Sequence, residues 1–255
     1  MRCITYIYRK LCCRKGFGVH SPFVFDLITN VIEETTTFYS YHDISRIRLQ
    51  LLQTTQPIHY RGKQISVKKA LRLYGISKKE GEFLFRLTNY YKPRTILAIG
   101  SSFGLIPLYL TRYRSEVQCV VLECEQDLAE IAKQVLSKEK NPALQILTGA
   151  YDVIIPESIA HLRQIDCIYI GKDVGIDNFT TVFQLCVPFI HDHTCCVLAD
   201  IRSSSEQQHR FRQCCQHPRV TVAVDLLNTG LLFFQPKLHK RVYKAILPSL
   251  PYYLW

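Results

Sequence analysis

The sequence lacks any apolar run of the roughly 18–20 residues that a membrane-spanning helix needs. Its first residues, MRCITYIYRKLCCRKGFG, place basic side chains on both sides of a short apolar patch. They contain neither a continuous hydrophobic stretch nor a small-residue cleavage site, so we expect no membrane span and no secretory signal. The chain also has no internal repeat and no low-complexity tract.

A cysteine pattern that would hold zinc is missing as well. None of the 11 cysteines forms a C-x-x-C pair, and their number is odd. Three doublets consist of neighbours that rarely bridge to each other and do not build a zinc knuckle; they are Cys12-Cys13, Cys195-Cys196 and Cys214-Cys215. We expect reduced, mostly buried thiols that pack in the core, and hence a cytoplasmic protein.

The composition is that of a folded protein. Of the 255 residues, 47% are hydrophobic and 21% are charged, and the mean hydropathy is close to zero. These values exclude a mostly disordered chain. The length suits one large domain, or one domain with an N-terminal addition.

The formal net charge of +11 is confined to one part of the chain. Residues 1–95 contain 17 Lys and Arg against 6 Asp and Glu, whereas residues 96–255 contain 15 of each kind. Two parts with different roles are therefore indicated. The basic part is either a solvated helical face or a surface for an anionic partner, which could be nucleic acid, a membrane surface or an acidic substrate.

Residues 1–92 carry signals for several helices. Ser21 followed by Pro22 is typical of a helix start, and apolar residues then recur at helical spacing. Further start and stop signals are Asp43 and Ser66 as N-caps, Gly75 as a stop, Ser77 with Glu80 as a capping box, and a helix end near Tyr91 before Pro93. We predict a basic N-terminal helical cap region over 1–92.

From Thr95 onward, short apolar runs alternate with amphipathic stretches. This alternation predicts a parallel sheet covered by helices on both faces. Two final apolar runs, joined through Asn228 and Gly230, predict a hairpin whose last strand is antiparallel. The strands are expected at Thr95–Ile99, Cys119–Glu123, Leu144–Leu147, Cys167–Ile170, Cys195–Asp200, Val220–Leu226 and Leu231–Phe234. Helices are expected near 104–113, 126–138, 151–162, 177–190 and 203–216.

One motif in this region carries chemistry. The first strand ends in ILAIGSSFG, where Gly100 permits a sharp exit and Gly104 allows a helix N-terminus to approach a ligand. Glu123 ends the next strand about 20 residues later, where an acid can accept both hydroxyls of a ribose. The combination points to an adenosine-containing cofactor; the alternative is an ordinary tight turn and a surface acid. Ser102 replaces the second glycine of the dinucleotide fingerprint, which argues against NAD.

The sequence resembles the class I S-adenosylmethionine-dependent methyltransferases, and most of all a bacterial group distantly related to the catechol-type O-methyltransferases. The resemblance spans nearly the whole chain and rests on GFGVHSPFVFDLI, KEGEFLFRLTNYYKPRTILAIGSSFG, VVLECE, Gly149-Ala150 and VTVAVDLLNTGLLFF. It implies an α/β fold with a Rossmann-like seven-stranded sheet in residues 93–255. S-adenosylmethionine would lie at the carboxyl ends of the first two strands.

The resemblance also implies roles for individual residues. Around the methionine and ribose it places Gly100, Ser101, Ser102 and Gly104, with Glu123 on the ribose hydroxyls and Gly149 and Ala150 near the adenine.

Three acids that are common in such enzymes are missing. Ala98, Gly171 and Ala199 stand at their positions, although Asp173 and Asp200 lie close by. In the catechol-type enzymes, acids at the corresponding strand tips hold a divalent metal. Because two isolated aspartates make a poor cage for a hard cation, we expect no metal.

The candidate catalytic residues are Asp200 and His20. Asp200 should lie beside the cofactor and could act as a base, or it could cap the helix that follows. His20, in the G-V-H-S-P stretch, could be a base, a ligand contact or a lid residue, or could fix the turn before a helix. Asp173 could contact the methionine amine or the substrate, or be a loop acid. Lys172 could bind an anionic substrate group, or be solvated.

Three functions remain open from the sequence. The first is a methyltransferase that uses S-adenosylmethionine to methylate a small molecule at oxygen. The second is a catalytically silent methyltransferase-like binding protein, which the missing acids would explain. The third is an RNA-modifying methyltransferase, although nucleic acid is not favoured as a partner because no RNA-binding module or nucleobase motif is present. The sequence does not indicate an oligomeric state.

Overall fold

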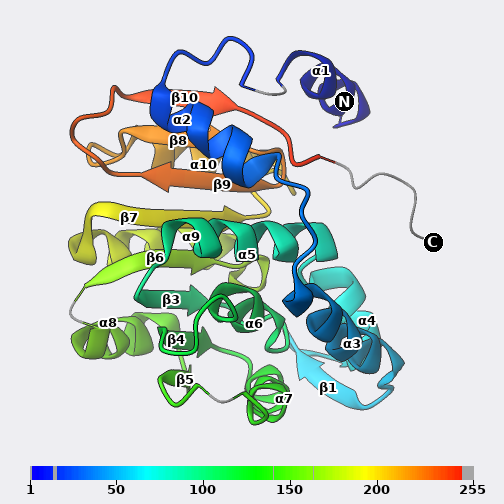
Figure 1. Cartoon of the computed structure of the whole chain (residues 1–255). Helices are drawn as coiled ribbons and strands as arrows, with labels where there is room; N and C mark the ends of the chain where they lie inside the picture. Colours follow the sequence, from blue (N-terminus) through cyan, green and yellow to red (C-terminus); the bar gives the residue numbers. More distant parts are fainter. Residues whose placement is uncertain (1, 14–15, 140, 163, 249–255) are drawn as a thin grey trace.

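The computed structural model describes residues 2–13, 16–139, 141–162 and 164–248. Its centre is an eight-stranded sheet with the order β10-β8-β9-β7-β6-β3-β4-β5 (Figure 1). The strands are β3 (Thr95–Ile99), β4 (Gln118–Glu123), β5 (Leu144–Thr148), β6 (Ile165–Ile170), β7 (Ile190–Ala199), β8 (Val222–Asp225), β9 (Thr229–Phe233) and β10 (Arg241–Lys244).

The order and directions of the strands confirm the predicted fold class. Strands β5, β4, β3, β6 and β7 run parallel, and β9 is antiparallel to both β7 and β8. The seven expected strands are all present. An eighth strand, β10, adds to the edge parallel to β8; its four residues are mostly exposed, and so short an edge strand leaves little apolar pattern in the sequence.

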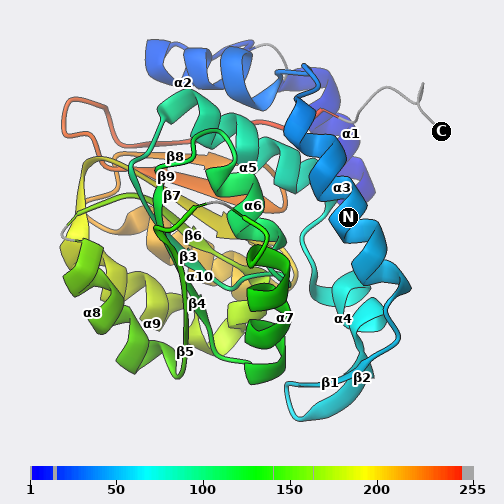
Figure 2. The ribbon, with the colours of Figure 1, turned by 60° about the horizontal axis from the view of Figure 1, so that its bottom comes forward.

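Helices cover both faces of this sheet (Figure 2). Because successive residues of a strand point to opposite faces, Ile96 and Ala98 belong to one apolar cluster while Leu97 and Ile99 belong to the other. The first face packs against α2 (Pro22–Leu27), α5 (Lys78–Tyr91), α6 (Leu105–Thr111) and α7 (Gln126–Leu136). The second packs against α8 (Tyr151–Leu162), α9 (Ile176–Cys186) and α10 (Ser205–Gln216).

The N-terminal region contains the expected helices. Ser21 caps α2, and the Ser77–Glu80 capping box opens α5, which ends at Tyr91. Ser66 caps α4 (Val67–Tyr74), which stops at Gly75. The remaining elements are α1 (Arg2–Cys12), the π-helix η1 (Ile28–Ile32) and α3 (Tyr39–Gln53). The expectation that Asp43 caps a helix is wrong, because α3 begins four residues earlier, after Phe38, and Asp43 lies within it.

The region also contains a β-hairpin, which the all-helical interpretation missed. Strands β1 (Pro57–Tyr60) and β2 (Lys63–Ser66) pair antiparallel. Arg61 and Gly62 both have positive φ, 50° and 71°, as a tight two-residue hairpin turn requires. Ile58 and Tyr60 are buried beneath it while their neighbours are exposed. Alternation over so few residues was too short a signal for a confident strand prediction.

Helix α1 is held to the far end of the chain by a buried ion pair. Arg9, 1% exposed, donates from Nη1 to Asp225 Oδ1 at 2.9 Å and from Nη2 to Asp225 Oδ2 at 2.8 Å. Nη1 also donates to the carbonyl oxygens of Asp225 and Ala245. Within the described residues, no helix combines the length and the apolar character that crossing a bilayer requires.

Candidate functional site

The turn that leaves β3 has an unusual backbone. Gly100, Ser102, Phe103 and Gly104 all have positive φ, between 47° and 88°. This conformation is costly for the serine and the phenylalanine, so it persists only where surrounding contacts fix it. The Ser102 hydroxyl provides one such contact, because it accepts a hydrogen bond from Ile76 N at 2.8 Å.

Glu123, at the end of β4, lies directly against this turn. Its Oε2 accepts hydrogen bonds from Ser101 N at 3.0 Å and from Ser101 Oγ at 2.8 Å, and the residue is fully buried. Its Oε1 accepts from Glu125 N at 3.4 Å. The structure thus brings together the predicted turn and the predicted acid.

The other predicted cofactor residues lie in two further places. Gly104 faces α7, where an added Cβ would lie 3.1 Å from Val135 Cγ1, so this glycine serves close helix packing. Gly149 follows β5 and donates from its N to Glu123 O at 3.2 Å, which places it next to the acid. Ala150 follows it and is exposed.

A cover from the N-terminal region lies over these strand ends. We use the word cover for the hairpin Pro57–Ser66 together with the segment Tyr74–Ser77. The segment reaches the turn through the Ile76 N to Ser102 hydrogen bond. The hairpin reaches the sheet through Arg61, which donates from N to Glu125 Oε1 at 3.1 Å and from Nη2 to Lys172 O at 3.2 Å. The Arg61 guanidinium also lies 5.3 Å from the ring centres of both Tyr60 and Tyr74.

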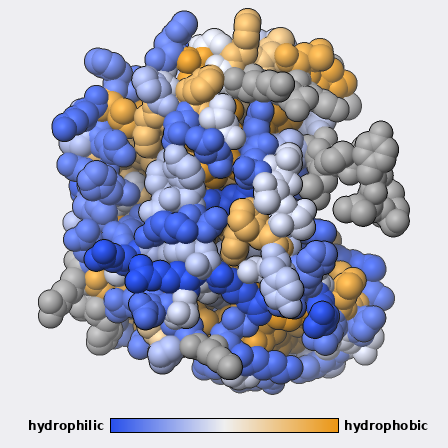
Figure 3. Space-filling view, viewed as in Figure 1, coloured by the Kyte–Doolittle hydropathy of each residue, from blue (hydrophilic) through white to orange (hydrophobic). Residues whose placement is uncertain are grey.

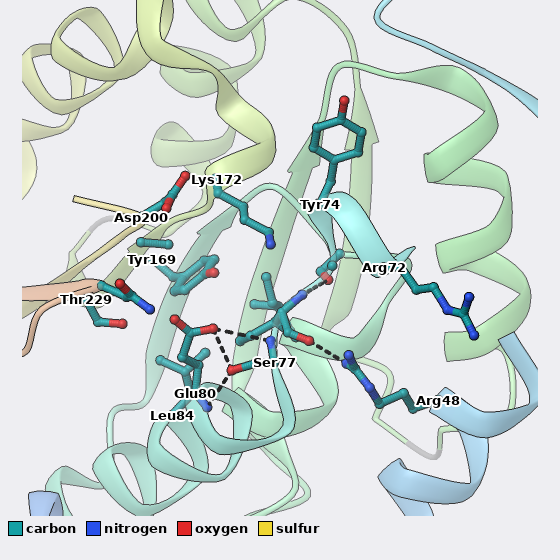
Figure 4. Close-up of a pocket in the computed structure, with 16 residues that line it drawn as sticks. Arg48, Arg72, Tyr74, Ser77, Glu80, Leu84, Tyr169, Lys172, Asp200 and Thr229 are labelled. Carbon is teal, nitrogen blue, oxygen red and sulfur yellow. Dashed lines mark hydrogen bonds between the residues drawn. The ribbon is translucent and has the colours of Figure 1, made fainter. Parts of the chain in front are cut away.

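Beside this cover, a cavity of about 300 Å³ opens at the carboxyl ends of β3, β6 and β7 (Figure 4). The Lys172 side chain and the Tyr169 hydroxyl point toward the same space, whereas Arg72 points away from it. The lining also includes Arg48, Tyr74, Gly75, Ile76, Ser77, Glu80, Leu84, Ser102, Ile106, Ala199, Asp200, Asn228 and Thr229.

Charges of both signs meet in the cavity. Arg48 donates from Nη1 to Ile76 O, and its burial lowers its pKa against the opposing influence of Tyr109 and Glu80. Glu80 is held by Ser77, whose hydroxyl donates to Glu80 Oε2 at 2.7 Å. Lys172 Nζ lies 3.4 Å from Leu73 O. The cavity can therefore hold a polar, zwitterionic molecule, with cations and carboxylates available within one small space.

Asp200 lines the cavity, as predicted from its place at the end of β7. It is not the cap of the following helix, because the N-cap of α10 is Ser204, whose side chain accepts from Gln207 N at 3.0 Å. Asp200 has a positive φ of 56° and accepts through its carbonyl oxygen from Ser203 N. The backbone of Asp173 lies in the short 3-10 turn η2 (Lys172–Val174), but its side chain lies outside the described part of the structure.

His20 is exposed and does not line this cavity. It precedes α2, whose Phe23 ring lies 4.9 Å from the ring of Phe233. Phe233 pairs with Cys195, four residues before β7 ends at Ala199. The structure therefore does not bring His20 together with Asp200.

The possible metal ligands and the thiols among the described residues also bear on the chemistry of the site. In the part of the chain that the structure describes, no three His, Cys, Asp or Glu side chains gather to hold a metal ion. The ten described cysteines are free thiols, and seven of them are buried. Burial raises the pKa of buried thiols such as Cys195 and Cys196 well above the ordinary value, so they remain protonated packing groups.

Neither a protein-family model nor a curated protein sequence matches the chain. Solved structures do match it. The O-methyltransferase of Bacillus cereus in complex with SAH superposes with a TM-score of 0.58 at 16% identity, over 83% of this chain and 95% of that one. The chain has the class I methyltransferase fold.

Two further methyltransferase structures agree with this result. The O-methyltransferase TomG of Streptomyces achromogenes in complex with SAM gives a TM-score of 0.58 at 14% identity, over 84% of this chain and 95% of that one. A methyltransferase of Geobacter sulfurreducens gives 0.55 at 14% identity, over 79% and 91%. The methyltransferase-fold expectation drawn from the sequence is confirmed.

Sequence reasoning missed Arg48, Arg61 and Tyr169 as site residues. Arg48 and Arg61 come from the N-terminal region, 52 and 39 residues before Gly100, the first residue of the turn they help to cover. Tyr169 lies inside an apolar strand and resembles a core residue. The one usable signal was Gly62, which marks the hairpin turn.

Proposed function

We propose that the chain is an S-adenosylmethionine-dependent methyltransferase that methylates an oxygen atom of a small molecule. The observation that carries this proposal is the contact between the Gly100–Gly104 turn and Glu123, at the tips of two adjacent parallel strands, beside a cavity at the tips of β3, β6 and β7. Ligands of open α/β sheets bind in the crevice at the carboxyl ends of the strands.

The residues present fit such a cofactor in kind. Glu123 would accept hydrogen bonds from a ribose diol, and the lack of a side chain at Gly100 and the small one at Ser101 would let the ligand approach the backbone. Gly149, whose N donates to Glu123 O, and Ala150 would lie near the adenine. Because Glu123 is fully buried, the residues around it must move before a ribose can reach it.

When bound, the cofactor supplies an electrophilic methyl group on a sulfonium. The chain has to align an acceptor oxygen and exclude water. Leu84 and Ile106 give the cavity apolar walls, and the Lys172 ammonium can bind an acceptor oxygen and stabilise its negative charge. Asp200 is our candidate for the base that takes the acceptor's proton. We propose no role for a metal.

A silent binding protein with this fold is the second candidate. Two observations favour it: Ala98, Gly171 and Ala199 carry no acid, and the Glu123 carboxylate already accepts two hydrogen bonds from Ser101. In that case cofactor or product would bind without methyl transfer. For either function we propose a cytoplasmic location, since the buried thiols are suited to a reducing compartment.

Calorimetry with S-adenosylmethionine and S-adenosylhomocysteine tests the shared premise. We expect both to bind at micromolar concentrations, and absence of binding at millimolar concentrations would rule the cofactor out. Glu123→Gln should weaken both affinities by at least about tenfold, because a hydrogen bond to a charged group contributes about 1.5–3 kcal/mol. Glu130→Gln, an exposed acid on α7, is the matched control.

Transfer of a labelled methyl group to a panel of phenols and carboxylic acids then separates the two functions. Asp200→Asn should lower turnover while leaving cofactor affinity unchanged. Cofactor binding without transfer to any acceptor would favour the silent protein.

A further inference from the structure

Helix α1 buries a charged side chain and exposes apolar ones, which is the reverse of an ordinary surface helix. Its Arg9 points inward, where it is 1% exposed and paired with Asp225. Three of its large apolar side chains point outward, with exposed fractions of 52% for Ile7, 59% for Tyr8 and 77% for Leu11. A surface helix normally buries its apolar stripe and exposes its charges.

The outward apolar residues form one continuous face. Residues three and four apart lie on the same side of a helix, so Leu11 neighbours both Ile7 and Tyr8. Phe17, just beyond the helix, is 83% exposed. Figure 3 shows hydrophobic residues gathered on the surface where α1 lies in Figure 1. We call Ile7, Tyr8, Leu11 and Phe17 the apolar face.

The charge of the same segment has one sign. Residues 1–25 contain five basic residues, namely Arg2, Arg9, Lys10, Arg14 and Lys15, and no acidic residue. Arg9 is paired with Asp225, and the other four basic residues of this segment give it a formal charge of +4. Short helices that combine aromatic and aliphatic residues with Lys and Arg bind at the interface of anionic membranes.

We propose that α1 is an interfacial helix that docks this chain on an anionic lipid bilayer. The apolar face enters the boundary between headgroups and acyl chains, and the basic residues contact the anionic headgroups. The Arg9–Asp225 pair gives the helix its orientation, because it fixes the inward side and thereby presents the apolar side to the lipid. This inference does not depend on methyl transfer.

Charge selects the bilayer over the other possible occupants of this face. Two copies of the chain meeting through α1 would bring together two segments that are both positively charged, which costs association energy. Single-stranded RNA stacks its bases on aromatic rings, whereas two of the three large apolar side chains that the described part of the helix exposes are aliphatic. A lipid surface satisfies both the apolar and the basic groups.

Docking would also bring the cavity near the lipid. Tyr6 of the same helix lines a groove of about 770 Å³. That groove shares Ser77, Glu80 and Asn228 with the cavity at the strand tips. A ligand leaving the bilayer beside α1 therefore meets this groove first.

Vesicle flotation of the full chain tests the proposal. We expect binding to vesicles of phosphatidylcholine with about one third phosphatidylglycerol, weak binding to phosphatidylcholine alone, and a loss of binding at high salt. Ile7→Glu with Leu11→Glu should reduce the bound fraction on anionic vesicles by about tenfold or more. Leu49→Glu, an equally exposed leucine on α3, is the control and should bind like the wild type.

The thermal midpoint and the cofactor affinity of the double variant are measured alongside, so that unfolding is not mistaken for lost docking. Equal binding by the double variant and the wild type would overturn the proposal, as would no binding to anionic vesicles. So would a wild-type dimer that the double variant breaks in the absence of lipid. Binding of a labelled single-stranded RNA that the double variant loses, with no vesicle binding, would overturn it in favour of nucleic acid.

Discussion

Helix α1 and the β1–β2 hairpin both come from the region before the sheet, but they are attached to it by different physics. Helix α1 is held through Arg9, whose guanidinium makes two hydrogen bonds to the carboxylate of Asp225 inside the protein. The hairpin packs Ile58 and Tyr60 into the apolar core, but its hydrogen bonds from His59 N to Asp127 at 2.5 Å and from Arg61 N to Glu125 at 3.1 Å are exposed.

This difference separates a fixed attachment from one that can open. Breaking a buried pair leaves an uncompensated charge in a medium of low polarity, whereas exposed contacts exchange with water at little cost. The hairpin also contacts the segments that follow β4 and β6, through Glu125 and Lys172. We therefore expect α1 to stay in place while the hairpin moves to admit a cofactor.

The largest loss of stability should come from Arg9→Ala. Removing the guanidinium leaves the Asp225 carboxylate with Arg202 and the Leu227 N–H, and we expect the free energy of unfolding to fall by about 3 kcal/mol. Denaturant unfolding measures this value. Arg46→Ala, an exposed arginine 3.9 Å from Asp43, is the control and should change it by less than about 0.5 kcal/mol. Equal losses of unfolding free energy in the two variants would contradict the idea that the buried ion pair holds α1 more strongly than an exposed one would.

Acid should weaken the α1 attachment next. Burial alone would raise the pKa of Asp225, but hydrogen bonds from Arg9 and Arg202 outweigh it and hold that pKa below its ordinary value. A lowered pKa stabilises the fold above the ordinary carboxyl value of about 3.9, and this contribution disappears as the pH falls through the folded pKa. Between neutral pH and about pH 3, the free energy of unfolding should therefore fall less for Arg9→Ala than for the wild type, as denaturant unfolding at each pH would measure.

The smallest change in stability should come from the hairpin. We expect Asp127→Asn to cost less than about 1 kcal/mol, because its contact with His59 is exposed. Amide hydrogen exchange of residues 57–66 should nevertheless become faster, and cofactor association should not slow. Glu157→Gln on α8 is the control. Exchange as slow as in the wild type would mean that other contacts hold the cover closed.

The features of the fold that could be predicted are those marked by residues close together in the sequence or by a general rule of parallel sheets. Glycines in the turn and the acid on the next strand were found because parallel strands bring such residues together by rule, and Glu123 does contact Ser101. The short strands β1, β2 and β10 were missed because each holds only four residues and these are mostly exposed or only partly buried, whereas the equally short β8 is fully buried and apolar enough to be recognised. Their stability comes from partners elsewhere in the chain, which no local pattern encodes.

Long-range placement explains the outcome for the site as well. Asp200 reached the cavity because a strand end fixes its position, and Ser204 then took the capping role that the sequence left open. No rule of this kind applies to His20, which follows a loop and precedes a short helix. Likewise, Arg48 and Arg61 cover the site only because the N-terminal region packs over it.

The Arg9–Asp225 pair also has a consequence for the order of events during synthesis. Its two residues are 216 positions apart, and Ala245, whose carbonyl oxygen Arg9 also contacts, comes 236 positions after it. On the ribosome, α1 emerges before the strands of the sheet, whereas Asp225 emerges only at the end of β8. The helix therefore cannot make this contact until β3 to β8 have been translated, so the contact belongs to the late steps of folding.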